Sequence, residues 1–499
     1  MTSLIIPHMK SKKLLRNFFR FWLVIALVYL LLLIPDSKKE IDQTRENSPF
    51  LWDQDSLWHQ LEAKYKEYKS FDTTRLDSLY QATSDSARWY YKFMLDEAAN
   101  PKSGFLDKLE LKMFDLAAIT AASGEHQSDY INFIVDLRRR IKKESINWPI
   151  DQVATRQRLY RLLYGSRMAL EEIELQSEDT TSIVMDYRNT QVKPNRPNLG
   201  QLFVRSGDIL VSRGGAPTSA LIARGNDYPG NFSHVALVYV DSVSGEVFII
   251  ESHIEIGVAV ATPEMYLKDK KLRILQLRLR DELIAKDPTL PYRAAEYAYH
   301  QAISEHIPYD FAMDYNDDQA LFCSEVASSA YRSEGLDLWM GISHISSPGL
   351  RSWLAAFGVN NFKTQEPSDL EYDPQLVIIE EWLNRATLFQ DHIDNAVIDI
   401  MLEDAEKGEQ LDYNLYQLPI ARLMKGYSWV KNLFGGAGPI PEGMSATAAL
   451  KNDAFSTKHH QIRELLKTKI EMFEKTNGYR PPYWQILPLA REAKDEIDR

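Results

Sequence analysis

Cys323, His234 and Glu251 have the side chains that nucleophilic catalysis by a thiol requires. Cys323 falls in the first turn of a predicted helix, where free N–H groups and positive potential stabilise a thiolate and later an oxyanion. His234 begins a hydrophobic strand, and Glu251 ends a neighbouring one. A histidine within reach can exchange a proton with the thiol, and a carboxylate can orient the imidazole ring. The pattern predicts Cys323 as nucleophile, His234 as base and Glu251 as the residue that orients the histidine.

Each of these residues also has a structural explanation when it is considered alone. A lone cysteine is more often a small buried hydrophobe, and a histidine or glutamate at a strand end is more often structural or a surface charge. The presence of all three residues at the ends of a helix and two strands, where they could meet, favours the catalytic interpretation. The competing interpretation is a non-catalytic, membrane-anchored binding scaffold on a degenerate enzyme core.

A metal site is the weaker interpretation of the same region. Glu251, His253 and Glu255 alternate along one strand and so share a face, as metal ligands can. No second histidine cluster of matching kind accompanies them. The sequence therefore predicts an activity that uses no metal and no cofactor.

The elements that must position these residues lie in a segment of about 200–345, where short strands alternate with helices. The predicted strands are β-branched or aliphatic runs bounded by turn residues, at 208–211, 234–240, 247–251, 258–261 and 272–277. Short and longer helices are predicted at 217–223, 291–304 and 324–333. This alternation predicts an α+β domain.

Helical periodicity dominates both flanks of this segment. The predicted organisation is a basic flank and membrane segment over 1–36, a helical region over 37–195, the α+β domain over 200–345 and a helical region over 346–499. A linker rich in proline and asparagine is predicted over 191–200. A basic group in the first helical region is predicted to lie on a solvated helix face, with contact to an anionic surface as the alternative; it comprises Arg138, Arg139, Arg140, Lys142 and Lys143.

An apolar run at residues 21–34 follows a basic flank and ends at Pro35 and Asp36. The flank holds five cations and no acid before Asp36: Lys10, Lys12, Lys13, Arg16 and Arg20. No small-residue cleavage site follows the run, so an uncleaved signal-anchor is favoured over a cleaved signal peptide. The positive flank predicts a single pass in the cell membrane with the bulk of the chain outside, or secretion if the leader is cleaved.

Charge and cysteine content narrow the functional classes further. The net charge is −12 although the N-terminal flank is basic, so the body is acidic and a poor match for nucleic acid. A single cysteine excludes an intrachain disulfide. In an exported protein this thiol is exposed to oxidants without cross-linking the fold.

Four motifs in the α+β segment resemble those of the circularly permuted papain-like amidases, the YiiX-like branch of the NlpC-type cysteine peptidase superfamily. They are Gly207-Asp-Ile-Leu210, Phe232-Ser-His-Val235, Ile250-Glu-Ser252 with Ile256-Gly-Val258, and Phe322-Cys-Ser-Glu325. The order His, Glu, Cys is that of the permuted branch. The resemblance implies a papain-like fold, an antiparallel sheet with packed helices, and the same three catalytic residues. It also implies that Tyr309 lines the substrate cleft.

These observations together predict a membrane-tethered cysteine hydrolase of the cell envelope. Its expected substrate is an amide or peptide bond, with cell-wall peptide as the natural candidate outside the membrane. A lipid acyl hydrolase or acyltransferase is the enzymatic alternative, because relatives in this superfamily include acyltransferases. The expected partners are an envelope substrate and the membrane, and not nucleic acid.

Overall fold

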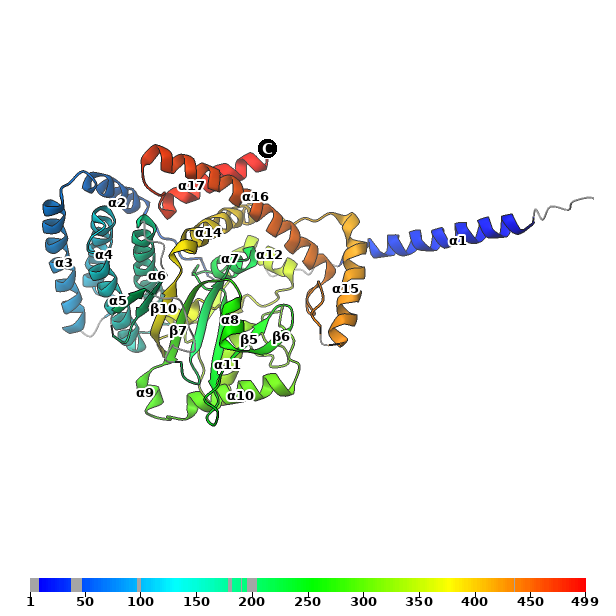
Figure 1. Ribbon diagram of the computed structural model, residues 1–499, viewed down its shortest axis with the longest axis horizontal. Helices are drawn as coiled ribbons and strands as arrows, with labels where there is room; N and C mark the ends of the chain where they lie inside the picture. The colour runs from blue at the N-terminus through cyan, green and yellow to red at the C-terminus, as the bar shows by residue number, and fades with distance from the viewer. Residues whose placement is uncertain are drawn as a thin grey trace, which may run out of the picture.

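The computed structural model describes residues 9–36, 47–96, 100–177, 182–189, 191–194, 204–434 and 436–499. The side chains of 9–15, 95–96 and 190–203 are not described, so most of the predicted linker lies outside these residues. Within them, one large antiparallel sheet forms the centre of the molecule and helices surround it (Figure 1).

The central sheet has eight strands in the order β2-β1-β10-β7-β3-β4-β5-β6, and all neighbouring strands whose pairing is described are antiparallel. Its strands are β1 (Ile183–Asp186), β2 (Gln191–Pro194), β3 (Ile209–Gly214), β4 (His234–Val240), β5 (Val247–His253), β6 (Gly257–Ala261), β7 (Lys271–Leu279) and β10 (Leu376–Leu383). A separate pair joins β8 (Ser343–His344) to β9 (Lys363–Thr364). The predicted α+β fold with an antiparallel sheet is thereby confirmed.

Helices cover both faces of the β3–β6 part of the sheet. The helices of this middle segment are α7 (Pro217–Arg224), α8 (Pro263–Lys268), α9 (Asp281–Ile284), α10 (Leu290–Ser304) and α11 (Cys323–Ser333). On one face α10 and α11 pack on β4, where Val235 and Leu237 share a core with Val326 of α11. On the other face α8 packs on β5 and β6, where Ala236 and Tyr266 share a second core. The alternation of side chains along β4 therefore separates the two cores.

An N-terminal group of helices packs at the β1–β10 end of the sheet. It consists of α2 (Asp55–Tyr68), α3 (Thr73–Asp96), α4 (Gly104–Ser123), α5 (Gln127–Glu144), η1 (Ser145–Asn147) and α6 (Val153–Gln176). α5 contacts β10, and α6 contacts α13 (Asp369–Tyr372). These contacts join the N-terminal helices to the segment that carries the sheet.

A C-terminal group of helices lies beyond α7 and is centred on α14. Its elements are α12 (Pro348–Phe357), α14 (Arg385–Glu406), η2 (Leu415–Gln417), α15 (Leu418–Leu433), α16 (Ala446–Asn477) and α17 (Tyr483–Ile497). Their core is a separate apolar cluster that includes Trp353, Ile398 and Ile462. Stacking of Trp58 on Trp484, with ring centroids 5.7 Å apart, joins this group to the N-terminal helices.

The sheet extends beyond the segment in which strands were expected. β1 and β2 lie in a stretch predicted to be helix or linker, and β10 lies in the predicted C-terminal helical region. β10 pairs with both β7 and β1, so it joins the early and middle parts of the chain. A pairing between residues so far apart in sequence leaves no local signal, and a strand buried between two others shows no simple alternation.

The prediction that the basic group of α5 lies on a solvated helix face is wrong in part. Arg138 and Lys142 do not lie on a solvated face but are buried, whereas Arg139 remains exposed. Arg138 pairs with Glu371, and the Lys142 ammonium donates to the carbonyl oxygen of Asp373. Burial lowers the pKa of Lys142 to about 7. The prediction failed because the acceptors come from the segment near residue 371, which the local pattern of α5 does not reveal.

The N-terminal helix α1 (Met9–Leu32) extends away from the body of the molecule and meets it beside α15 (Figure 1). No helix among the described residues is both long enough and apolar enough to cross a membrane. The signal-anchor expected over 1–36 is not supported by this criterion and stays a prediction.

Candidate active site

Glu251 lies between two histidines at the end of the sheet. Its carboxylate oxygens lie 2.7 Å from Nε2 of His234 and 3.1 Å from Nε2 of His253. The geometry follows from the strand register, in which Ala236 faces Glu251 across β4 and β5. His234 and His253 therefore lie one step further along the same face, with their ring centroids 5.8 Å apart. Because Nε2 of His234 is engaged by Glu251, Nδ1 is the nitrogen left to meet a reacting group.

Burial and the central carboxylate set the charges of this cluster. Burial raises the pKa of Glu251, but the hydrogen bonds with His234 and His253 outweigh it and hold the pKa below its ordinary value. Burial lowers the pKa of His234 despite the same hydrogen bond. Burial also lowers the pKa of His253, yet the bond to Glu251 more than offsets it and the pKa is raised. Near neutral pH, Glu251 is thus ionised and His234 is a neutral base.

Lys271 is a further charged group at this cluster. It begins β7, and its ammonium lies 4.3 Å from the ring centroid of Tyr266. Its charge lowers the pKa of both His234 and His253, while its own pKa is lowered by burial. A cation held here keeps the imidazole of His234 unprotonated, which a general base requires.

Cys323 is the first residue of α11, and the chain that leads into it is held from several sides. The N–H of Phe322 donates to Oε2 of Glu325 at 2.9 Å, a bond that closes the start of the helix. The hydroxyl of Ser252 donates to the carbonyl oxygen of Leu321 at 2.6 Å. Because Ser252 follows Glu251 on β5, this bond ties the start of the cysteine helix to the strand that carries the carboxylate.

The thiol of Cys323 is buried, with 5% of the residue exposed. Burial raises the pKa of the thiol to about 12, although the backbone N–H groups of Val235 and Ser324 act in the opposite direction. The helix N-terminus that the sequence predicted is present, but loss of solvent outweighs it. In the resting site the thiol is therefore protonated and the imidazole of His234 is neutral, so the two do not form a thiolate–imidazolium pair.

The elements that carry the thiol and the imidazole belong to opposite faces of the sheet. His234 shares the face of Ala236, which α8 covers, whereas α11 packs on the face of Val235. The thiol comes close to the end of β4, where the backbone of Val235, the residue after His234, acts on it. Among the described residues, no hydrogen bond joins the Cys323 sulfur to the His234 ring. The structure thus forms the His234–Glu251 pair and brings Cys323 to the main chain beside it.

Tyr309 is another residue near the thiol. The nearby Cys323 is among the causes that, after burial, hold the pKa of Tyr309 well above its usual range. The carbonyl oxygen of Pro308 accepts from the N–H of Leu321 at 3.0 Å, which fixes the Tyr309 loop to the start of α11. Glu366 also acts on the Cys323 thiol, and burial raises the pKa of the Glu366 carboxyl well above its usual value.

Sequence reasoning did not assign several residues that shape this site. His253 was considered only as a metal ligand, although its alternation with Glu251 was the available signal. The hydroxyl of Ser368 accepts from the N–H of Phe232 at 3.0 Å and donates to its carbonyl at 3.1 Å, just before His234. Ser368 lies far along the chain, so no local pattern indicates this contact. The roles of Ser252 and Lys271 were not assigned because Ser252 bonds to Leu321, and Lys271 acts on His234, across long stretches of sequence.

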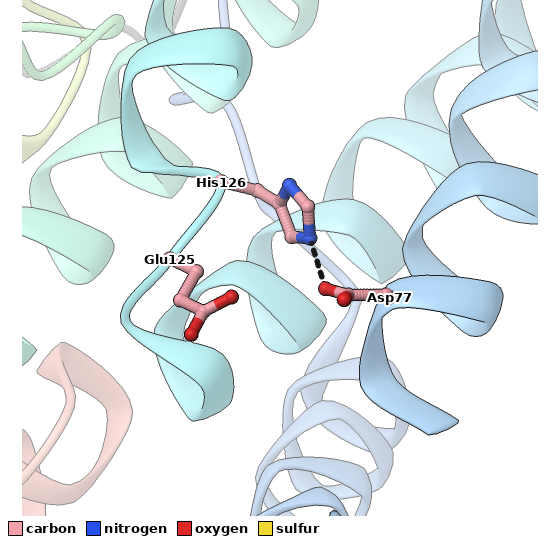
Figure 2. A group of neighbouring side chains, drawn as sticks. All are labelled: Asp77, Glu125 and His126. Carbon is pink, nitrogen blue, oxygen red and sulfur yellow. Dashed lines mark hydrogen bonds and ion pairs between the residues drawn. The ribbon is translucent and has the colours of Figure 1, made fainter. Parts of the chain in front are cut away.

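A group of side chains with metal-ligand atoms lies away from these residues, between α3 and the α4–α5 loop. Figure 2 shows Asp77 and His126 joined by a 2.8 Å contact, with Glu125 beside them. Their ligand atoms all lie within 4.8 Å of one another. The imidazole of His126 also stacks on Tyr80, with ring centroids 3.9 Å apart. Exposed carboxylates commonly gather without a cation, and no catalytic step follows from this group.

An apolar cavity of about 280 Å³ also lies apart from the candidate site. It is lined mainly by residues of α2, α4, α6 and α17, among them Trp58, Phe114 and Trp484. Cys323, His234 and Glu251 are not among its lining residues. Its position between the N-terminal and C-terminal helices explains its aromatic walls, because those helices meet there through large rings.

Comparison with known proteins agrees with the geometry of the middle segment. Residues 204–379 match the family model of permuted papain-like amidase enzymes, YaeF/YiiX, of the C92 family. Searches of curated proteins and of solved structures found no match. The matched segment contains Cys323, His234 and Glu251 and ends within β10. The predicted resemblance is therefore confirmed for residues 204–379, which are similar to the permuted papain-like amidases of the YaeF/YiiX, C92 family.

Proposed function

We propose that the chain hydrolyses an amide or peptide bond of a cell-envelope substrate by nucleophilic catalysis, with Cys323 as nucleophile and His234 as base. Glu251 orients the histidine and stabilises its protonated form. The observation that carries the proposal is the His234–Glu251 pair, 2.7 Å apart, at the end of the strand on which the cysteine helix packs. The match of residues 204–379 to a family model of amidase enzymes supports the same chemistry.

The reaction begins from the protonated thiol. As the sulfur attacks the carbonyl carbon, its proton passes to Nδ1 of His234, and a carbon–sulfur bond forms. The oxyanion is stabilised by N–H groups at the start of α11. When the carbon–nitrogen bond breaks, the imidazolium gives its proton to the leaving amine. Water, deprotonated by the same histidine, then hydrolyses the thioester and releases the acid and the thiol.

The proposal includes a membrane tether and a location outside the cytoplasm. The basic flank before the apolar run supports this orientation, because positive residues stay on the cytoplasmic side. Cell-wall peptide is the natural substrate there. A reporter fused to the C-terminus should be active only outside the cytoplasm, and activity in the cytoplasm would contradict the proposed orientation.

The catalytic proposal is tested on the full chain with peptidoglycan-derived peptides and acyl esters. We expect Cys323→Ser to lower kcat by about a thousandfold or more, because a hydroxyl is a far weaker nucleophile near neutral pH. His234→Ala should be nearly as damaging. Glu251→Gln should cost less, because an amide carbonyl can still hold Nε2 of the ring.

The matched control for His234→Ala is His300→Ala, at an exposed position of α10. It should keep the turnover of the unmodified chain. Wild-type turnover by Cys323→Ser on any substrate that the chain cleaves would show that the cysteine mechanism is wrong.

A further inference from the structure

The outer face of α15 carries exposed apolar side chains. Ile420 and Leu423 are 62% and 67% exposed, and Tyr427 and Phe434 continue the same stripe at helical spacing. The inner face is occupied by Leu418, Ala421 and Ser428, which are buried. An amphipathic helix on a soluble body has the opposite arrangement, with its polar side outward.

This face continues onto α1. The hydroxyl of Tyr29 donates to the carbonyl oxygen of Tyr416 at 3.3 Å. Arg422 donates to the carbonyl oxygen of Leu32 at 3.0 Å and pairs with Asp36 at 2.8 Å. Apolar side chains are exposed along α1 from Phe18 to Leu31. In Figure 1 the two helices meet at one end of the molecule, with α15 running crosswise to α1.

These two helices differ from the rest of the chain in the sign of their charge. The segment 418–434 contains the cations Arg422, Lys425 and Lys431 and no acidic residue, and residues 9–32 likewise contain only cations. The whole chain nevertheless has a net charge of −12. Helices that carry apolar residues, Trp and Tyr among them, together with cations and no acidic residue have the composition of helices that lie in the interface of an anionic bilayer.

We propose that α15 docks on an anionic lipid bilayer, with its outer face buried among the acyl chains and its axis in the plane of the membrane. A helix in this position does not need to span the bilayer. The continuity with α1 lets both apolar surfaces enter the same membrane. A second copy of the chain is the poorer occupant, because a two-fold interface on this face would bring the same cations together.

Docking through α15 would hold the candidate active site beside the membrane. The inner face of α15 and the loop after it share an apolar cluster with Ile254 and Phe311. Ile254 follows His253, and Phe311 lies 5.0 Å from Tyr309 between ring centroids. Substrates attached to the membrane or presented at its surface would therefore come within reach of Cys323. This last consequence rests on the proposed function, whereas the docking itself does not.

The single native cysteine makes the docking testable on the full chain. In the Cys323→Ser background, Leu423→Cys is labelled with an environment-sensitive nitrobenzoxadiazole fluorophore. The matched control is Met472→Cys on α16, which is 62% exposed and also apolar. Both proteins are reconstituted into nanodiscs of phosphatidylcholine and phosphatidylglycerol at a ratio of about 3:1, a surface anionic enough to attract the cations. Quenching by doxyl-labelled lipid and by aqueous iodide is then measured.

We expect doxyl lipid to quench the label at 423 and iodide to leave it largely unquenched, with the reverse at 472. Equal quenching of both labels by iodide would overturn the proposal. A label at 423 that is protected from both quenchers would identify a second copy of the chain on this face, which also overturns it. Because both proteins lack the thiol, a failure of docking is distinct from a failure of the catalytic proposal.

Discussion

At the start of α11, burial and the helix N-terminus act on the Cys323 thiol in opposite directions, and burial dominates. The pKa of the thiol is raised to about 12, while the pKa of His234 is lowered. The proton therefore stays on sulfur in the resting protein, and in the proposed mechanism His234 takes it during the attack. This arrangement limits oxidation of the only thiol in the chain, since the thiolate is the reactive form.

Alkylation of the resting protein tests this state. We expect iodoacetamide to react with Cys323 slowly at pH 8 and without a plateau below about pH 10, because the reactive thiolate is scarce. The same thiol in the urea-unfolded chain should react about a thousandfold faster, as a thiol of ordinary pKa near 8.5 does. Mass spectrometry of the modified cysteine gives both rates. A plateau near pH 6–7 in the folded protein would instead indicate a preformed thiolate–imidazolium pair.

The acid limb of the activity profile should report His234. Since its pKa is lowered, kcat/KM should fall only below the ordinary histidine pKa of 6.5. Lys271→Met removes a charge that lowers this pKa, so the acid limb should move to higher pH. Lys270→Met, at the exposed neighbouring position, is the matched control and should leave the limb unchanged. Identical acid limbs for both variants would show that Lys271 does not act on the base.

At the scale of elements, Gly257 holds β6 against the loop that carries Tyr309. It has φ +72°, and a Cβ at this position would lie 2.1 Å from the carbonyl oxygen of Ile307. That carbonyl accepts from the N–H of Val258 at 2.9 Å. The close approach of the two main chains therefore requires a residue without a side chain.

A comparison of Gly257→Ala with Gly245→Ala separates the cost of a left-handed backbone from the cost of a steric clash with Ile307. Gly245 also has φ +72°, but a Cβ there meets nothing within 4 Å. We expect Gly245→Ala to cost about 1 kcal/mol of unfolding free energy, from the left-handed backbone alone. Gly257→Ala should cost about 1–3 kcal/mol more and should lower turnover, because the Tyr309 loop must shift. Urea unfolding and activity assays measure both effects, and equal losses would refute the role of the Ile307 contact.

Across the whole molecule, a buried ion network joins the N-terminal helices to the sheet. Arg138 of α5 and Arg167 of α6 both pair with Glu371, and Arg167 also pairs with Glu381 of β10. The hydroxyl of Tyr187 donates to Glu381 at 3.1 Å. Burial raises the pKa of Glu371, but Arg167 and Arg138 outweigh it and hold the pKa below its ordinary value. Residues far outside the amidase segment thus take part in its support.

Glu371→Gln should lower the free energy of unfolding by about 3–5 kcal/mol, because two buried guanidinium groups lose the carboxylate that balances their positive charge. Glu282→Gln is the matched control, since Glu282 pairs with Arg280 at 3.0 Å but is exposed. It should cost at most about 1 kcal/mol. Urea denaturation followed by circular dichroism gives both values. Similar losses for the two variants would show that the network does not stabilise the molecule.

The sequence by itself determined the class of the middle segment. Cys323, His234 and Glu251 stand at element ends that local periodicity and turn residues reveal, and the neighbouring strands β4 and β5 followed from their short connection. The motifs around these residues were enough to indicate the amidase family, because each motif is a short run of neighbouring residues.

Only the tertiary structure decided which further strands complete the sheet of that segment and which of its buried groups are ionised. β1 and β10 entered the sheet from distant parts of the chain, and Arg138 turned inward because Glu371 meets it from another element. The thiol pKa depends on burial by the whole surrounding fold, which the helix N-terminus does not indicate. The outward apolar face of α15 likewise became visible only when its buried side was known. Local periodicity records which residues share a face, whereas long-range packing decides which face is covered.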